Sequence, residues 1–168
     1  MVILGVDPGL RHTGFCIVGE GNRVVARGVL VPPGRGRIQP EKVIDYVLPA
    51  LCRLIDEHHP HCAVVEQVTW YGARRRITLP LSHVAGAIAG FCLGIGIPVY
   101  LLLANMKRGG KAPRGKSWTE HERDAYMLAS VVKRHLAAAA AGDRSTLPER
   151  SAVARRRITA PKSAHGTN

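Results

Sequence analysis

Residues 2–6 form a continuous apolar run, VILGV, that ends at Asp7 and is followed by the turn-forming pair Pro8-Gly9. A short run that is apolar at every position predicts a strand buried on both faces, inside a sheet covered on two sides. A carboxylate at the end of such a strand loses its hydration, so a positive partner such as a metal ion must compensate. Taken alone, Asp7 can also simply cap the Pro8-Gly9 turn.

A second acidic residue lies near the end of a second apolar run. Residues 62–68 (CAVVEQV) predict another buried strand, and Glu66 stands close to its carboxyl end. Further along the chain, His121 and Asp124 are three residues apart on a predicted helix and therefore share a face. If the two strands are neighbours in the sheet, the four side chains can form one cluster.

Such a cluster is chemically informative because carboxylates gathered in one place repel unless cations bind between them. Oxygen ligands favour Mg²⁺ or Mn²⁺, and an imidazole in the set shifts the preference towards Mn²⁺. Two such ions about 4 Å apart can activate a water and stabilise the departing oxygen in phosphodiester cleavage. The pattern therefore predicts a metal-dependent reaction on phosphate esters.

The remaining periodicities predict strands alternating with helices. Gly21-Asn22 joins two strands into an antiparallel hairpin, and Pro49 is expected to kink or break the first long helix. The predicted elements are strands at 13–20, 23–31 and 97–103, helices at 40–58 and 77–94, a mobile cationic loop at 105–117, and a helix that starts at the capping box Ser117-Trp118-Thr119-Glu120 and ends near residue 140. This order is typical of an α/β fold in which helices cover a mixed sheet.

The charge balance favours a polyanionic partner. The chain has 24 Lys and Arg residues against 12 Asp and Glu residues, a formal net charge of +12, and phosphate neutralisation by such a surface releases counterions. A membrane surface is the rival partner, but no segment joins a large amphipathic moment to a basic face. No apolar run reaches about 18 residues and no signal peptide precedes the first strand, so we expect a soluble, cytoplasmic protein without a membrane partner.

The cysteines and a histidine cluster have plain structural interpretations. Cys16, Cys52, Cys62 and Cys92 are widely spaced in apolar surroundings, which predicts reduced, buried thiols. The run His58-His59-Pro60-His61 can be read as a metal site, but adjacent histidines before a proline are more typical of a solvated helix end.

Three segments together resemble the RuvC family of Holliday-junction resolvases: ILGVDPGLRHTGF, AVVEQV and HERDAYMLA. The resemblance covers roughly residues 1–136. It implies a ribonuclease-H-like fold with a five-stranded mixed sheet, a homodimer acting on branched DNA, especially four-way junctions, and two Mg²⁺ or Mn²⁺ ions in each active site. Asp124 stands at an acidic position of the family motif, and His121 at one where members carry Asp or His.

Carried over to this chain, the resemblance makes Asp7, Glu66, His121 and Asp124 the catalytic metal ligands. The family places an aromatic wedge after the glutamate motif, and Lys107 with Lys111 or Lys116 matches basic residues that hold the scissile strand. The candidate DNA contacts are Arg11, Thr69, Trp70, Tyr71, Arg74, Arg75, Arg76, Lys107, Arg108, Lys111, Arg114 and Lys116. Burial of Trp70 and Tyr71 in the core or the dimer interface, and simple solvation of the basic residues, are the competing interpretations.

The chain also departs from the family pattern. The stretch between the last predicted strand and His121 is short and lacks a whole helix of the family pattern, which resembles phage-type members, and the wedge position itself is Thr69. We expect a nuclease domain at 1–142 and a basic, disordered tail at 143–168. The sequence thus predicts a junction-resolving endonuclease; the alternatives are a broader flap or branched-DNA nuclease of the same fold, and a non-catalytic nucleic-acid-binding module.

Overall fold

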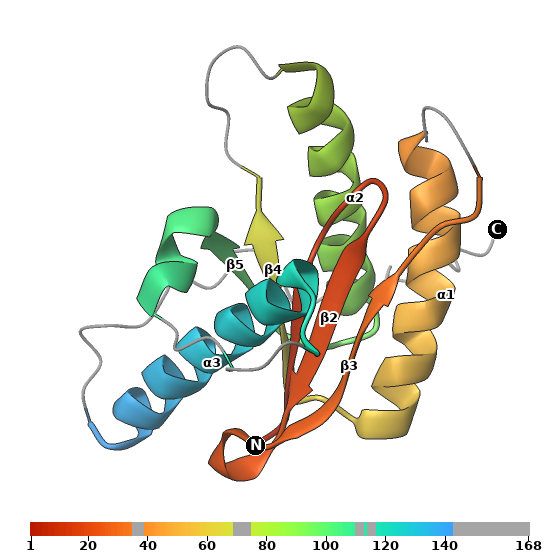
Figure 1. The fold of residues 1–168 in the computed structure, drawn as a ribbon. Coiled ribbons are helices and arrows are strands. Elements are labelled where there is room, and N and C mark those ends of the chain that lie inside the picture. Colours follow the sequence, from red (N-terminus) through yellow and green to blue (C-terminus); the bar gives the residue numbers. More distant parts are fainter. Residues whose placement is uncertain (35–38, 69–74, 110–112, 114–116, 143–168) are drawn as a thin grey trace, which may run out of the picture.

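A five-stranded mixed sheet forms the centre of the computed structural model, with helices packed on both faces (Figure 1). The structure describes residues 1–34, 39–68, 75–109, 113 and 117–142; of residues 75–77 and 107–109 it describes the backbone but not the side chains. The elements are β1 (Ile3–Asp7), β2 (Thr13–Val18), η1 (Glu20–Asn22), β3 (Val24–Leu30), α1 (Pro40–His58), β4 (Cys62–Gln67), α2 (Arg75–Gly94), β5 (Val99–Leu103), η3 (Ala104–Gly109) and α3 (Glu120–Ala140).

The strand order β3-β2-β1-β4-β5 confirms the predicted mixed sheet. The first three strands form an antiparallel meander, whereas β4 pairs parallel with β1 and β5 parallel with β4. Val6 of β1 is paired with Val65 of β4, so the next residues along the two strands, Asp7 and Glu66, lie at the same end of the sheet. The register therefore makes neighbours of the two strand-end acids.

Successive strand residues divide between two cores because side chains alternate across a strand. Leu4, Val6 and Val65 pack with α1 and α2, while Ile3 and Val64 pack under α3 on the other face. Figure 1 shows α3 crossing one face of the sheet, with α1 and α2 behind it. Both faces are covered, which explains why β1 and β4 are apolar at almost every position.

Helix α1 runs unbroken from Pro40 to His58, with Pro49 inside it, so of the two predicted effects of Pro49 a break is wrong and a kink stays a prediction. Val47 and Leu51 on either side of Pro49 are completely buried in the core. Packing of this apolar face keeps the helix together despite the hydrogen bond that a proline cannot donate.

The start of α3 also differs from the prediction. The helix begins at Glu120, its N-cap is Thr119, and the capping box pairs Thr119 with Glu122 rather than Ser117 with Glu120. The first residues of the stretch 105–117, which was predicted as a loop, belong to the 3₁₀ helix η3 (Ala104–Gly109). The helix itself ends at Ala140, as predicted.

The histidine cluster confirms the helix-end interpretation. Helix α1 ends at His58, and His59 is its C-cap in the left-handed conformation, donating its backbone N–H to the carbonyl of Ile55. The cysteines of the described residues are free, as expected; Cys16, Cys62 and Cys92 are buried, but Cys52 is only partly so, because it faces outward from α1 towards Asp56.

Among the residues that the structure describes, no helix is both long enough and apolar enough to span a bilayer. The predicted tail at 143–168 lies outside the described residues.

Candidate metal centre

Three carboxylates from three separate elements meet at the edge of the sheet. Asp7 ends β1, Glu66 stands near the end of β4 and Asp124 is in the second turn of α3. One carboxylate oxygen from each lies within 4.8 Å of the others. Asp7 is buried, whereas Glu66 and Asp124 are partly exposed, so the cluster opens to solvent on one side.

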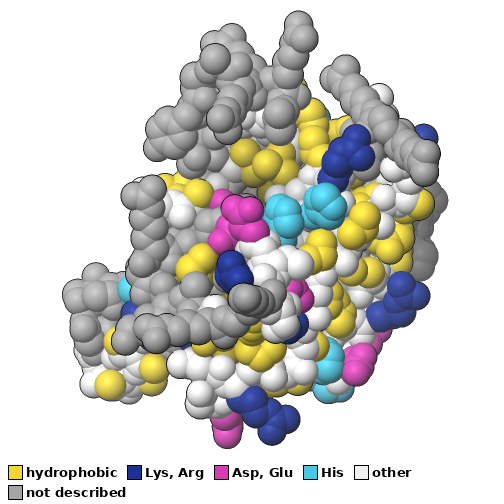
Figure 2. All heavy atoms as spheres, in the orientation of Figure 1, with side chains coloured by type: hydrophobic (Ala, Val, Ile, Leu, Met, Phe, Trp, Pro, Cys, Tyr) yellow, Lys and Arg dark blue, Asp and Glu magenta, His cyan; other side chains and the backbone are white. Residues whose placement is uncertain are grey.

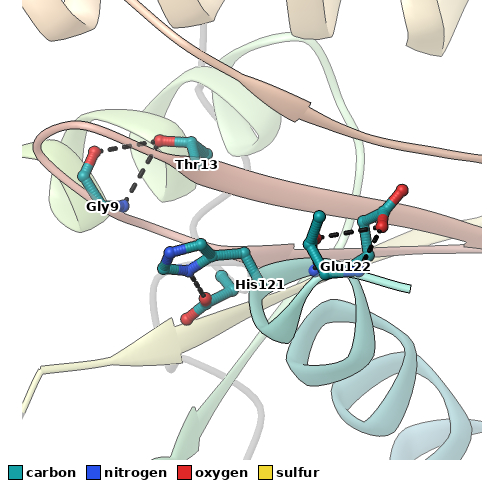
Figure 3. Close-up of polar contacts among 6 residues, drawn as sticks. Gly9, Thr13, His121 and Glu122 are labelled. Atoms are coloured by element: carbon teal, nitrogen blue, oxygen red, sulfur yellow. Dashed lines mark hydrogen bonds and ion pairs between the residues drawn. The ribbon is translucent and has the colours of Figure 1, made fainter. Parts of the chain in front are cut away.

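His121 lies at the border of this cluster. His121 lies in the first turn of α3, and its Nδ1 atom is 2.8 Å from Oδ2 of Asp7 (dashed line at His121 in Figure 3). The His12 ring stacks on the His121 ring, with centroids 5.5 Å apart. Within the described residues, the three carboxylates form a group whose ligand atoms all lie within 4.8 Å of one another. His121 is not part of this group and contacts it through Asp7.

A threonine closes the turn that follows Asp7. Thr13 Oγ1 donates to the carbonyl oxygen of Gly9 and accepts from the Gly9 N–H, at 3.1 and 3.3 Å (Figure 3). Thr13 is completely buried, so its hydroxyl needs these partners. The hydroxyl thus fixes the turn between β1 and β2 beside the carboxylate of Asp7.

Close packing of α3 against the sheet brings Asp124 to the two strand ends. A Cβ atom on Gly5 would collide with the carbonyl of Ala125, and one on Gly14 with the carbonyl of His121. Only glycine allows the backbone of α3 to approach β1 and β2 so closely.

A pocket of about 210 Å³ adjoins the carboxylates. Asp7 and Glu66 line it together with Val68, Leu81 of α2 and Ala104 of η3. On the face that α3 crosses, Figure 2 shows acidic side chains directly beside histidine side chains. A group bound in the pocket would therefore contact both carboxylates and an apolar wall.

The donor set suits a hard divalent cation. Carboxylate oxygens are the ligands that Mg²⁺ and Mn²⁺ prefer, and three of them leave coordination positions for water or substrate oxygens. Their mutual repulsion also falls when a cation binds between them. The residues present therefore fit a divalent metal ion.

The other candidate DNA contacts fall on several segments. Arg11 is exposed in the turn between β1 and β2; Arg75 and Arg76 belong to α2, and Lys107 and Arg108 to η3, but these four side chains are not described. The candidates outside the described residues are Thr69, Trp70, Tyr71, Arg74, Lys111, Arg114 and Lys116.

Two neighbours of the cluster were not predicted. His12 belongs to the first motif, but a stacking partner 109 positions further along the chain leaves no local signal. Arg27 contacts the start of α3 from β3, and a lone arginine within a strand pattern gives no sign of this contact.

The sheet order, the covering helices and the carboxylates at adjoining strand ends define a ribonuclease-H-like protein with a candidate metal centre. A family model described as crossover junction endodeoxyribonuclease RuvC matches residues 3–135. The chain belongs to the RuvC family.

Individual relatives agree with this assignment. The chain is 40% identical over 88 residues to crossover junction endodeoxyribonuclease RuvC of Caulobacter sp. (strain K31), covering 51% of this chain and 50% of the relative. It is 35% identical over 99 residues to the RuvC of Halorhodospira halophila, covering 58% of each. The chain therefore spans about half the length of these curated relatives or slightly more.

The fold agrees with a solved structure of the family. Thermus thermophilus RuvC in complex with a Holliday junction substrate superposes with a TM-score of 0.69, at 18% sequence identity, over 84% of this chain and 96% of that one. At this identity the likeness concerns the fold.

Proposed function

We propose that the protein is a divalent-metal-dependent endonuclease that resolves four-way DNA junctions as a symmetric homodimer. The observation that carries the proposal is the group of three carboxylates within 4.8 Å at the edge of the sheet. Membership of the RuvC family and the net charge of +12 support a nucleic-acid substrate.

In this proposal Asp7, Glu66 and Asp124 hold two Mg²⁺ or Mn²⁺ ions. When bound, the ions lower the pKa of a water and neutralise charge on the phosphate. Asp7 keeps the His121 ring in place through the 2.8 Å contact with Nδ1, which leaves Nε2 to bind an ion or to accept a proton from water. The pocket beside Asp7 and Glu66 has room for the part of a nucleotide next to the scissile phosphate.

The lysines and arginines in the segments 69–76 and 107–116 are proposed to bind the phosphates of the junction arms. A homodimer fits this substrate because a four-way junction has two-fold symmetry, so each protomer would nick one of two strands of like polarity. Light scattering of the purified protein should give the mass of a dimer.

The decisive experiment is cleavage of a synthetic four-way junction with Mg²⁺ and with Mn²⁺. Wild type is expected to give paired, symmetric nicks, while Asp7→Asn loses at least about 100-fold in rate because a charged ligand is missing. Asp45→Asn is the matched control, since Asp45 is exposed on α1, which packs on the opposite face of the sheet from α3. Undiminished nicking by Asp7→Asn would refute the proposed roles.

A broader branched-DNA or flap nuclease is the second candidate. Only residues 104–119 separate β5 from α3, so the family elements that would grip a junction there are shortened. A panel of flaps, forks and four-way junctions separates the two: faster cleavage of flaps favours the second candidate. Full junction binding in EDTA, without cleavage by any divalent ion, would instead indicate a non-catalytic binding module.

A further inference from the structure

Arg27 links the sheet to the start of α3. Its guanidinium carbon lies 4.0 Å from the centroid of the Trp118 ring, and its Nη1 lies 3.7 Å from Oε2 of Glu122. Its Nη2 donates to Ser117 Oγ at 3.4 Å. One side chain of β3 therefore contacts three residues that precede or begin α3.

Glu122 is the centre of this group. The residue is buried, and its Oε2 accepts from the backbone N–H of Thr119 at 2.8 Å and from the Thr119 hydroxyl at 3.0 Å, besides facing Arg27. Figure 3 shows Glu122 folded back on the start of the helix. A buried carboxylate is stable only with hydrogen-bond donors and an opposite charge, and Arg27 supplies the charge.

The same helical turns carry two members of the candidate metal centre. His121 precedes Glu122, and Asp124 follows it by two positions. Because each residue advances a helix by about 100°, Glu122 and Asp124 point to nearly opposite sides of α3. Fixing the direction of Glu122 therefore fixes the direction in which Asp124 points.

Trp118 makes the arrangement more rigid. Its ring contacts the Tyr126 ring edge to face, with centroids 5.7 Å apart, and both residues pack against the core under α3. Arg27 thus contacts a ring that is held by the helix it helps to place. A planar guanidinium can stack on this ring and face a carboxylate at the same time, which an ammonium cannot do equally well.

We propose that Arg27 is a positioning residue of the metal centre: its contacts with Trp118 and Glu122 fix the rotation of α3 and so hold Asp124 against Asp7 and Glu66. The inference rests on the metal-dependent function proposed above. Arg27 itself takes no part in ligation, and its effect reaches the ions through Asp124 and His121.

The test measures Mn²⁺ affinity directly, by electron paramagnetic resonance of free Mn²⁺ during titration of the full-length protein without DNA. Arg27→Met is expected to weaken Mn²⁺ binding by about 10- to 100-fold, as loss of a residue supporting metal ligands typically does. Arg27→Lys keeps the charge opposite Glu122 but loses the planar stack, so its affinity should lie between those of Arg27→Met and wild type.

The matched control is Arg23→Met, because Arg23 is exposed directly before β3 and its replacement removes the same charge. Its Mn²⁺ affinity should equal that of wild type. Circular dichroism and thermal unfolding show whether each variant is folded. If Arg27→Met does not fold, Arg27→Lys decides, and wild-type affinity in that variant would overturn the proposal.

The Mn²⁺ titrations distinguish an error about the metal centre from an error about the role of Arg27. If wild type binds no Mn²⁺, or if Asp7→Asn binds it as tightly, the metal centre itself is wrong. If Asp7→Asn abolishes binding while folded Arg27→Met binds like wild type, the metal centre stands and the role of Arg27 is wrong. A purely structural role for Arg27 predicts lower thermal stability with unchanged Mn²⁺ affinity, which likewise contradicts the proposal.

Discussion

At the scale of single residues, the distance between α3 and the sheet depends on two glycines that have no Cβ atom. Gly5 and Gly14 face the carbonyls of Ala125 and His121 so closely that a Cβ would overlap them. A backbone carbonyl inside a helix cannot rotate away, so any larger residue must displace the helix. These positions therefore couple helix packing to the placing of Asp124.

Gly14→Ala should destabilise the protein by about 1–3 kcal/mol, the usual effect of overpacking a tight contact. Gly86→Ala is the matched control, because nothing lies within 4 Å of its added Cβ on α2. Alanine is the better helix former, so this control should gain up to about 1 kcal/mol. Urea unfolding measures both variants, and equal stabilities would contradict the proposed close approach.

Cysteine reactivity tests the burial of β2. Burial raises the pKa of the Cys16 thiol from 9.0 to about 12, with a smaller lowering effect from Arg27. At pH 8, this higher pKa lowers the thiolate fraction of Cys16 about 1000-fold relative to an ordinary thiol. Iodoacetamide at pH 8 should therefore modify partly exposed Cys52 first, as mass spectrometry of the digested protein can show; equally fast labelling of Cys16 would refute its burial.

The sign of the accompanying pH effect follows from the same shift. Folded Cys16 stays protonated up to about pH 12, whereas in the unfolded chain the thiol ionises near pH 9. Its contribution to stability is therefore complete below pH 9 and is lost as the pH rises towards 12.

At the scale of elements, the first turn of α3 is central because it contains the capping box, the ion pair of Glu122 with Arg27, and His121 at the border of the candidate metal centre. Thr119→Ala removes the two hydrogen bonds that the Thr119 hydroxyl makes with Glu122 but keeps the bond from the backbone N–H of residue 119 to Glu122 Oε2, and it should cost about 0.5–2 kcal/mol. Ser117→Ala is the control and should cost less, since Ser117 is exposed and its hydroxyl accepts a 3.4 Å hydrogen bond from Arg27. Chemical denaturation ranks the two, and a larger loss in Ser117→Ala would favour the cap predicted from sequence.

The exact start of α3 could not be predicted from the sequence. Ser117-x-x-Glu120 and Thr119-x-x-Glu122 both match a capping box, and nothing local distinguishes them. The difference is tertiary: Glu122 is buried opposite Arg27 of β3, which stabilises the second box. Pro49 is a similar case, because the buried face of α1 outweighs a local helix-breaking preference.

The strands and the carboxylates were predictable for a different reason. A fully apolar run such as 2–6 can be satisfied only inside a covered sheet, and an acid at its end stands out against it. Spacing on a helix then added Asp124. Two other features could not be predicted, because they depend on contacts between residues far apart in sequence. These are the parallel pairing of β1 with β4, which brings Glu66 beside Asp7, and the stacking of His12 on His121.

At the scale of the whole molecule, the net charge of +12 is the property that bears on binding of DNA. Residues 143–168 contribute six Lys and Arg and two Asp and Glu, a net +4, so residues 1–142 retain 12 − 4 = +8. The predicted nuclease domain is therefore basic without the predicted tail. This division separates two sources of affinity that respond to different substitutions.

Replacing Arg155, Arg156 and Arg157 by Gln in the full-length chain isolates the tail. If each arginine neutralises one phosphate, the slope of log K against log salt for a four-way junction becomes shallower by about 2.7, since each contact contributes about 0.9. Fluorescence anisotropy in EDTA between 50 and 200 mM salt measures this slope without cleavage. The rate of nicking at saturating protein should stay at the wild-type value, because the tail is not proposed to contribute to the metal centre. An unchanged slope would show that these arginines do not contact the backbone, and a slower saturated rate would place the tail at the site of chemistry.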